Sequence, residues 1–154
     1  MTDENSAFQA VFPLAGPDAT KALGARIGAA LRPGDAVALA GDLGAGKTTL
    51  ARAILASLGV SETVPSPTFT LVQRYDTEKL SVSHFDLYRL KKPAEMDELG
   101  LDDALESGAA LIEWPERAQE RLPADRLRVD ILADAGERRA ILSGPARWLE
   151  LTDA

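Results

Sequence analysis

Residues 41–48 read Gly-Asp-Leu-Gly-Ala-Gly-Lys-Thr and match the pattern Gly-x-x-x-x-Gly-Lys-Ser/Thr at every fixed position. A continuous apolar run at 36–40 leads into this loop, and apolar residues at helical spacing continue from it to about Leu58. Gly59 stands where a helix C-terminal cap is expected. A buried strand, a glycine-rich loop and a helix in this order predict the first half of a β-α-β unit, and therefore a parallel sheet.

The residue types in this loop suit a phosphate chain. Glycines allow turns that present successive backbone N–H groups to an anion, and the following helix points the positive end of its dipole at it. Lys47 offers a positive charge to the β- and γ-phosphates, and the Thr48 hydroxyl is a ligand for Mg²⁺. A chance match in a glycine-containing turn is the alternative, and the flanking strand and helix argue against it.

The whole chain, 1–154, is expected to form a single α/β domain with a mostly parallel sheet and helices on both faces. Residues 68–75 and 80–86 are two extended stretches four residues apart, which predicts an antiparallel hairpin extension. The remaining expected elements are an edge strand at 7–14 limited by Pro13, a helix opened by Pro17, short helices ending at Gly100 and near Gly108, strands at 109–113, 127–131 and 138–142, and a tail helix at 146–151.

Charge and composition exclude several classes of function. The chain carries 17 Lys and Arg against 24 Asp and Glu, a formal net charge of −7, which disfavours autonomous nucleic-acid binding. The absence of cysteine excludes disulfide scaffolds, thiol nucleophiles and Cys-based zinc sites. Without a leader or a long apolar run, we expect a cytoplasmic protein with no membrane contact. Residues 95–106 hold six acids and no base, typical of a solvated face or a docking surface for a basic partner.

A P-loop site needs a carboxylate from a neighbouring strand to help hold Mg²⁺. Asp86 and Glu113 each end an extended run, and four apolar residues lead straight into Glu113, which places it at the carboxyl edge of the sheet. Either residue could instead be an ordinary charge where a strand meets water. Thr68 lies in Ser-Pro-Thr-Phe-Thr at 66–70, which fits both a γ-phosphate-sensing switch and plain turn chemistry.

Two other residues are ambiguous. Trp114 directly follows Glu113, where an indole could stack on a base or a partner, or fill the core. His84, the single histidine, alternates with Val82 in an extended run, and we expect a half-buried structural residue rather than a catalytic one.

Other P-loop classes are tested by their own motifs. Guanine recognition through Asn-Lys-x-Asp is absent, because Asn5 is the single asparagine. A small-molecule or nucleoside kinase stays open, with lid arginines available among Arg117, Arg121, Arg126 and Arg128, although the chain has little length for a lid. A nucleotide-gated binding module with negligible turnover is a further alternative.

Four blocks in order give the chain a specific resemblance. Gly-Asp-Leu-Gly-Ala-Gly-Lys-Thr-Thr at 41–49, Ser-Pro-Thr-Phe-Thr-Leu-Val at 66–72, His-Phe-Asp-Leu-Tyr-Arg-Leu at 84–90 and Ile-Glu-Trp-Pro-Glu at 112–116 resemble the bacterial TsaE (YjeE) family. The likeness extends over about residues 16–143. It implies a small ATPase, weak alone, that serves N6-threonylcarbamoyladenosine formation at position 37 of tRNAs reading ANN codons. It also implies a TsaB–TsaD heterodimer as partner, with tRNA reached only through that complex.

The resemblance also implies roles for particular residues. ATP phosphates would be bound by Gly44, Ala45, Gly46, Lys47, Thr48 and Thr49, and Mg²⁺ by Thr48, Asp86 and Glu113. Lys47, Asp86, Glu113 and a switch-like Thr68 would form the catalytic set. Trp114 and Pro115 would lie beside the nucleotide, and Thr20 and Gly136 would border the adenine.

Overall fold

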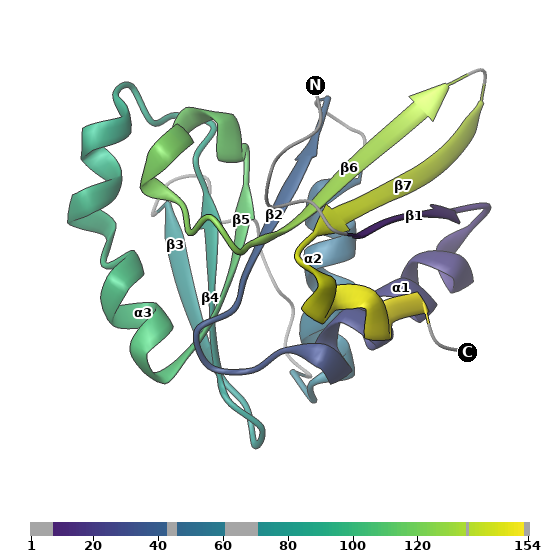
Figure 1. Ribbon diagram of the computed structural model, residues 1–154, viewed down its shortest axis with the longest axis horizontal. Helices are drawn as coiled ribbons and strands as arrows, with labels where there is room; N and C mark the ends of the chain where they lie inside the picture. The colour runs from purple at the N-terminus through teal and green to yellow at the C-terminus, as the bar shows by residue number, and fades with distance from the viewer. Residues whose placement is uncertain (1–7, 43–45, 61–70, 135, 153–154) are drawn as a thin grey trace.

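The alternating and continuous apolar runs of the sequence form one seven-stranded sheet with helices on both faces (Figure 1). The computed structural model describes residues 8–42, 46–60, 71–134 and 136–152. The strands are β1 (Phe8–Pro13), β2 (Ala36–Gly41), β3 (Val72–Asp76), β4 (Ser81–Asp86), β5 (Gly108–Glu113), β6 (Leu127–Asp134) and β7 (Glu137–Gly144). The helices are α1 (Pro17–Ala30), α2 (Lys47–Ser57) and α3 (Leu101–Ser107), with 3-10 helices η1 (Pro93–Leu99), η2 (Pro115–Arg117), η3 (Gln119–Arg121) and η4 (Ala146–Thr152).

The sheet has a parallel centre and antiparallel edges. Its strand order is β1-β7-β6-β2-β5-β4-β3, in which β6, β2, β5 and β4 run parallel to one another. The predicted hairpin is present as the antiparallel pair β3 and β4, and β1 with Pro13 lies at an edge as predicted. The antiparallel pairing of β7 with both β6 and β1 was not predicted.

The central strands are buried on both faces, which explains their continuous apolar sequences. In β5, Ala109 and Leu111 join a cluster with the apolar sides of α1 and α2. Ala110 and Ile112 face the opposite way and join Met96 of η1 and other residues of the second cluster. Glu113 is two residues after Leu111 in the same strand, so its side chain lies on the same face of the sheet, the face covered by α1 and α2.

Two short segments differ from the expected α-helices. The segment that ends before Gly100 is the 3-10 helix η1, and the tail at 146–152 is the 3-10 helix η4. Over only seven residues, the spacing of apolar side chains does not distinguish the i→i+3 hydrogen bonds of a 3-10 helix from the i→i+4 bonds of an α-helix. The sequence therefore predicted the positions of these helices but not their type. β3 begins at Val72, and residues 68–70 of its expected range lie outside the described residues.

Helices α1 and α2 pack closely on one face of the sheet and set the position of the P-loop helix. Pro17 occupies the first turn of α1, and Gly59, with φ of +96°, ends α2, both as predicted. Gly24 allows the close approach, because a Cβ there would lie 2.6 Å from the Cβ of Ala53 and 2.9 Å from the backbone nitrogen of Ile54. Among the described residues, no helix has the length and apolar character needed to cross a membrane.

We expect Gly24→Ala to lower the free energy of unfolding by about 1–3 kcal/mol, because the added methyl group forces α1 away from α2. Without the clash, the better helix propensity of alanine would instead raise stability by about 1 kcal/mol. Gly16→Ala is the matched control, since its Cβ would meet no atom within 4 Å and its φ of −179° suits any residue. Urea unfolding of both variants checks the sign, and a stabilised Gly24→Ala would contradict this packing.

Candidate functional site

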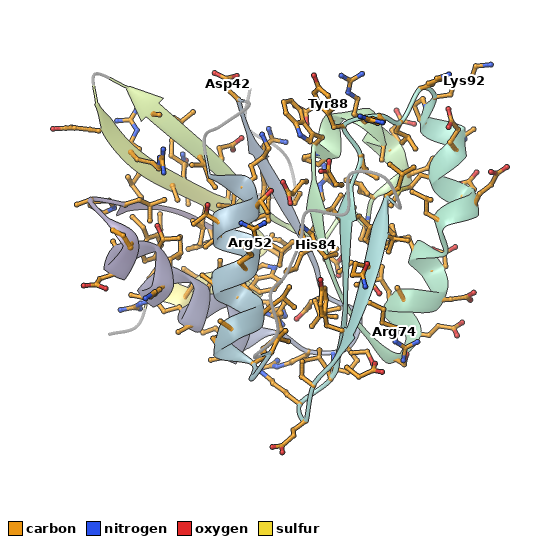
Figure 2. All side chains as sticks on the ribbon, turned by 180° about the vertical axis from the view of Figure 1, so that it is seen from behind. Asp42, Arg52, Arg74, His84, Tyr88 and Lys92 are labelled. Carbon is orange, nitrogen blue, oxygen red and sulfur yellow. The ribbon has the colours of Figure 1, made fainter. Side chains whose placement is uncertain are left out.

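The carboxyl ends of three parallel strands meet beside the start of α2. β2 ends at Gly41, β5 at Glu113 and β4 at Asp86, and Asp86 and Glu113 are partners in the strand register. Ligands of open α/β sheets bind at such an edge. Figure 2 shows Asp42 and Tyr88, the residues just beyond this edge, at the same end of the molecule.

The P-loop enters α2 through a glycine in the left-handed region. Gly46 has φ of +113°, where side chains are strained, and its carbonyl accepts the first helical hydrogen bond from Leu50 at 2.9 Å. The N–H groups of the first helical turn are free of helical bonds and favour an anion. Thr49 in this turn is exposed, while Gly44 and Ala45 lie outside the described residues.

Lys47 is buried at the site rather than extended into water. Its Nζ donates to the carbonyl oxygens of Gly41 and, at 3.0 Å, of Asp42. The ammonium also lies 3.7 Å from the ring centroid of Trp114, within cation–π distance. The charge that the sequence assigns to phosphate binding is therefore held at the end of β2.

Electrostatics at Lys47 act in two directions. Burial lowers the pKa of its ammonium below the ordinary 10.5, because desolvation disfavours the charged form. The carboxylates of Glu113, Glu116, Asp86 and Asp42 act in the opposite direction and favour the charged form. An ammonium surrounded by carboxylates at a helix start is suited to a multiply charged anion and its counter-cation.

The Glu113 carboxylate joins the P-loop helix to the sheet. Oε1 accepts a hydrogen bond from Oγ1 of Thr48 at 2.8 Å, and Oε2 lies 2.6 Å from Nε2 of His84. Glu113 is 2% exposed and His84 is fully buried, so these bonds form away from water. Glu113 is therefore no ordinary strand-end charge, and His84 is fully buried where a half-buried side chain was expected.

Asp86 lies next to Glu113 with its side chain on the same face of the sheet. It is buried, and its Oδ1 accepts a hydrogen bond from the backbone N–H of Tyr88 at 3.1 Å. The hydroxyl of Thr48 and these two carboxylates form an oxygen-rich set that suits Mg²⁺. Among the described residues, no group of three acidic or histidine side chains is placed to hold a metal ion by itself.

Aromatic side chains line the other side of Lys47. Trp114 is half-buried, with a backbone φ of +59°, and its ring centroid lies 5.0 Å from that of Tyr88. The Arg117 guanidinium lies 5.8 Å from the Tyr88 ring. Pro115 is buried and begins η2. Trp114 is therefore at the site, although it also packs against the second apolar cluster.

Several predicted residues are not brought to this point. Thr68 lies outside the described residues. Thr20 is buried in α1, and Gly136 forms the turn between β6 and β7; within the described ranges neither makes a hydrogen bond to the P-loop. The placement of Thr20 and Gly136 beside an adenine stays a prediction.

The arginines considered for a kinase lid are mostly engaged elsewhere. Arg121 pairs with Asp97 at 3.5 Å, and Arg128 pairs with Asp130 at 2.9 Å. Arg126 donates to the carbonyl oxygen of Pro123 at 2.9 Å. Among these four, Arg117 alone lies beside the aromatic residues of the site, through its contact with Tyr88.

Sequence reasoning missed two residues of the site, His84 and Arg138. The signal for His84 was its spacing, because residues two apart in a strand share a face and His84 stands two before Asp86. Arg138 of β7 places Nη1 3.4 Å from where a Cβ of Gly46 would be. Its side chain makes no salt bridge within the described residues. No sequence signal marked Arg138, since only the long-range pairing of β7 brings it there.

Comparisons with known proteins agree with this geometry. The model of a family described as "Threonylcarbamoyl adenosine biosynthesis protein TsaE" matches residues 14–141. A relative from Bacillus subtilis, named tRNA threonylcarbamoyladenosine biosynthesis protein TsaE, is 39% identical over 81% of this chain and 78% of its own. One of the same name from Streptomyces coelicolor is 42% identical over 75% and 80%. The crystal structure of Bacillus subtilis YdiB superposes with a TM-score of 0.80 and 32% identity, covering 94% of this chain and 92% of that one.

We expect Arg138→Ala to weaken ADP binding about threefold to tenfold, because it removes a cation beside the phosphate-binding turn. Arg139→Ala is the control: it removes the same charge from the opposite face of β7 and should leave affinity unchanged. Titration calorimetry at two salt concentrations measures both, and the Arg138 effect should shrink as salt rises. Equal affinities for the two variants would contradict a role for Arg138.

Proposed function

The chain belongs to the TsaE family of threonylcarbamoyl adenosine biosynthesis proteins, and we propose that it is a Mg²⁺-dependent ATPase subunit acting in tRNA modification. The observation that carries the proposal is the bond from Thr48 at the start of the P-loop helix to the buried Glu113 carboxylate. This arrangement puts a hydroxyl, a carboxylate and the Lys47 ammonium around one helix N-terminus. Such a site suits phosphoryl transfer from a nucleoside triphosphate.

Phosphate binding falls to the start of α2 and to Lys47. The N–H groups of the first helical turn would face the β-phosphate, and Lys47 would leave the carbonyls of Gly41 and Asp42 to meet the β- and γ-phosphates. Residues that would hold Mg²⁺ are Thr48, Asp86 and Glu113. The ion would neutralise charge on the phosphates, as metals do in this class of reaction.

Hydrolysis is a transfer of the γ-phosphoryl group from ADP oxygen to water. The water oxygen forms a bond to phosphorus, the bond to the β,γ-bridging oxygen breaks, and the water proton passes to phosphate or solvent. Glu113 either orients this water or completes the Mg²⁺ shell, and its placement beside Thr48 serves both roles. Loop N–H groups and Lys47 would stabilise the charge that spreads over the γ-oxygens.

The acidic charge of the chain favours a protein partner over direct tRNA binding. A formal charge of −7 opposes non-specific association with a phosphate backbone. On the strength of the family membership, we propose that a TsaB–TsaD heterodimer is the partner, that tRNA is reached only through it, and that the complex works in the cytoplasm. We expect slow turnover of the isolated chain, since Lys47 at rest donates to the carbonyls of Gly41 and Asp42 and must leave them to meet the phosphates.

We expect Lys47→Ala and Glu113→Gln each to lower ATP turnover at least a hundredfold, because Lys47 would stabilise charge on the phosphates and Glu113 would orient the water or hold Mg²⁺. Glu98→Gln is the control: it removes one exposed carboxylate on η1 and should leave turnover unchanged. Radiolabelled γ-phosphate distinguishes release to water from transfer to a small acceptor. Label appearing on an acceptor, with none released as phosphate, would replace the ATPase with a kinase.

We expect the TsaB–TsaD heterodimer and tRNA to raise the ATP turnover of this chain several-fold, since Lys47 at rest is bonded to the carbonyls of Gly41 and Asp42 rather than placed for the phosphates. The measurement compares phosphate release by the chain alone, with the heterodimer, and with heterodimer plus tRNA. tRNA alone should have no effect, because a net charge of −7 opposes association with its phosphate backbone. Stimulation by tRNA in the absence of the heterodimer would contradict indirect access.

A further inference from the structure

The buried imidazole of His84 contacts the residue on which the proposed site depends. Nε2 of His84 lies 2.6 Å from Oε2 of Glu113, and both side chains are shielded from water. A carboxylate only accepts, so the hydrogen between them belongs to Nε2. The other ring nitrogen, Nδ1, has no hydrogen-bond partner within the described residues. In that part of the chain, the polar contact of the buried His84 ring is therefore with Glu113.

The two oxygens of Glu113 have different partners. Oε1 receives the Thr48 hydroxyl and Oε2 the His84 ring, so the plane of the carboxylate is fixed from both sides. A buried carboxylate oxygen without a partner is costly, and with His84 removed Oε2 would have to turn toward another donor. That rotation would take Oε1 away from Thr48 and from the start of α2.

His84 is well placed to hold this orientation rigidly. It lies in the middle of β4, which has β5 on one side and β3 on the other. Its side chain lies on the α1–α2 face of the sheet, between Val82 and Asp86, and Figure 2 shows it inside the molecule below the edge where Asp42 lies. An imidazole enclosed in this way has little freedom to leave Glu113.

We propose that His84 is a positioning residue, which holds the Glu113 carboxylate in the orientation that serves Thr48 and the bound Mg²⁺–nucleotide. The inference rests on the proposed function, because it assigns His84 to the same site. It makes no use of a charge change on the ring. His84 is not expected to touch the nucleotide.

Glutamine and asparagine at position 84 provide a matched pair of variants. The amide nitrogen of glutamine is as many bonds from the backbone as Nε2 of histidine, so His84→Gln can still donate to Oε2. The amide of asparagine is one bond shorter and reaches only to the position of Nδ1. Both variants are polar and similar in size, so a general loss of packing would affect them alike.

The experiment measures ADP affinity by titration calorimetry with Mg²⁺ and with EDTA, along with kcat and KM for ATP. We expect His84→Asn to lose about tenfold or more of the affinity gain that Mg²⁺ produces, and to lower kcat more than it raises KM. Affinity in EDTA should stay nearly unchanged, because within the described residues no hydrogen bond joins His84 to Lys47 or to the first turn of α2. His84→Gln should recover most of both losses. Thermal unfolding confirms that each variant is folded.

The outcomes separate this inference from the proposed function. If His84→Asn keeps the wild-type Mg²⁺ gain and kcat, or if the glutamine and asparagine variants are equally impaired, His84 has no positioning role. If the wild-type chain itself gains no affinity from Mg²⁺ and releases no phosphate, the proposed function fails and this inference falls with it.

Discussion

The hydrogen bond from Thr48 to Glu113 is the interaction on which the site depends. It ties the first turn of α2 to the last residue of β5 at 2.8 Å, so the P-loop helix and the sheet cannot move independently at that point. Close packing of α1 on α2 through Gly24 fixes the same helix from its other side. The start of α2 is therefore positioned by the packed core.

Local charge at the site runs against the charge of the whole chain. A formal charge of −7 repels a nucleotide at long range, but salt screens that field beyond about 10 Å at 0.1 M ionic strength. Positive charge is present close to the phosphate-binding turn. It comes from the Lys47 ammonium, from the N-terminus of α2 and from the Arg138 guanidinium beside Gly46. The carboxylates of Asp86 and Glu113 share the same space, and for a polyphosphate to approach them a cation must lie between. This balance of charges supports the proposal that the site takes a metal–nucleotide pair.

The sequence predicted the parts of the fold that local chemistry determines. The strand at 36–40, the helix that follows the P-loop, the edge position of the Pro13 strand and the hairpin of β3 and β4 all follow from periodicity and proline. Asp86 and Glu113 were chosen as Mg²⁺ candidates because each ends an extended run, and both are buried side by side. The features that the sequence did not predict depend on long-range pairing. They are the antiparallel pairing of β7 with β6 and β1, and the position of Arg138 beside Gly46 that follows from it. The contact of His84 with Glu113 was not predicted. The alternation of residues along β4 shows which side chains share a face, but the contact depends on the pairing of β4 with β5.

The position of the Lys47 side chain helps to explain why Trp114 adopts a backbone conformation that is unfavourable for a residue with a side chain. A left-handed φ of +59° costs a tryptophan about 1 kcal/mol or more, so compensation must come from its contacts. The ring lies 3.7 Å from the Lys47 ammonium, an attraction of about 0.5–2 kcal/mol for a partly desolvated pair, and it also packs against Tyr88. Burial lowers the pKa of Lys47, and the nearby carboxylates, Glu113 first among them, act in the opposite direction. A phosphate chain that draws Lys47 away would remove part of what stabilises Trp114, so occupancy of the P-loop and the backbone after β5 are energetically linked.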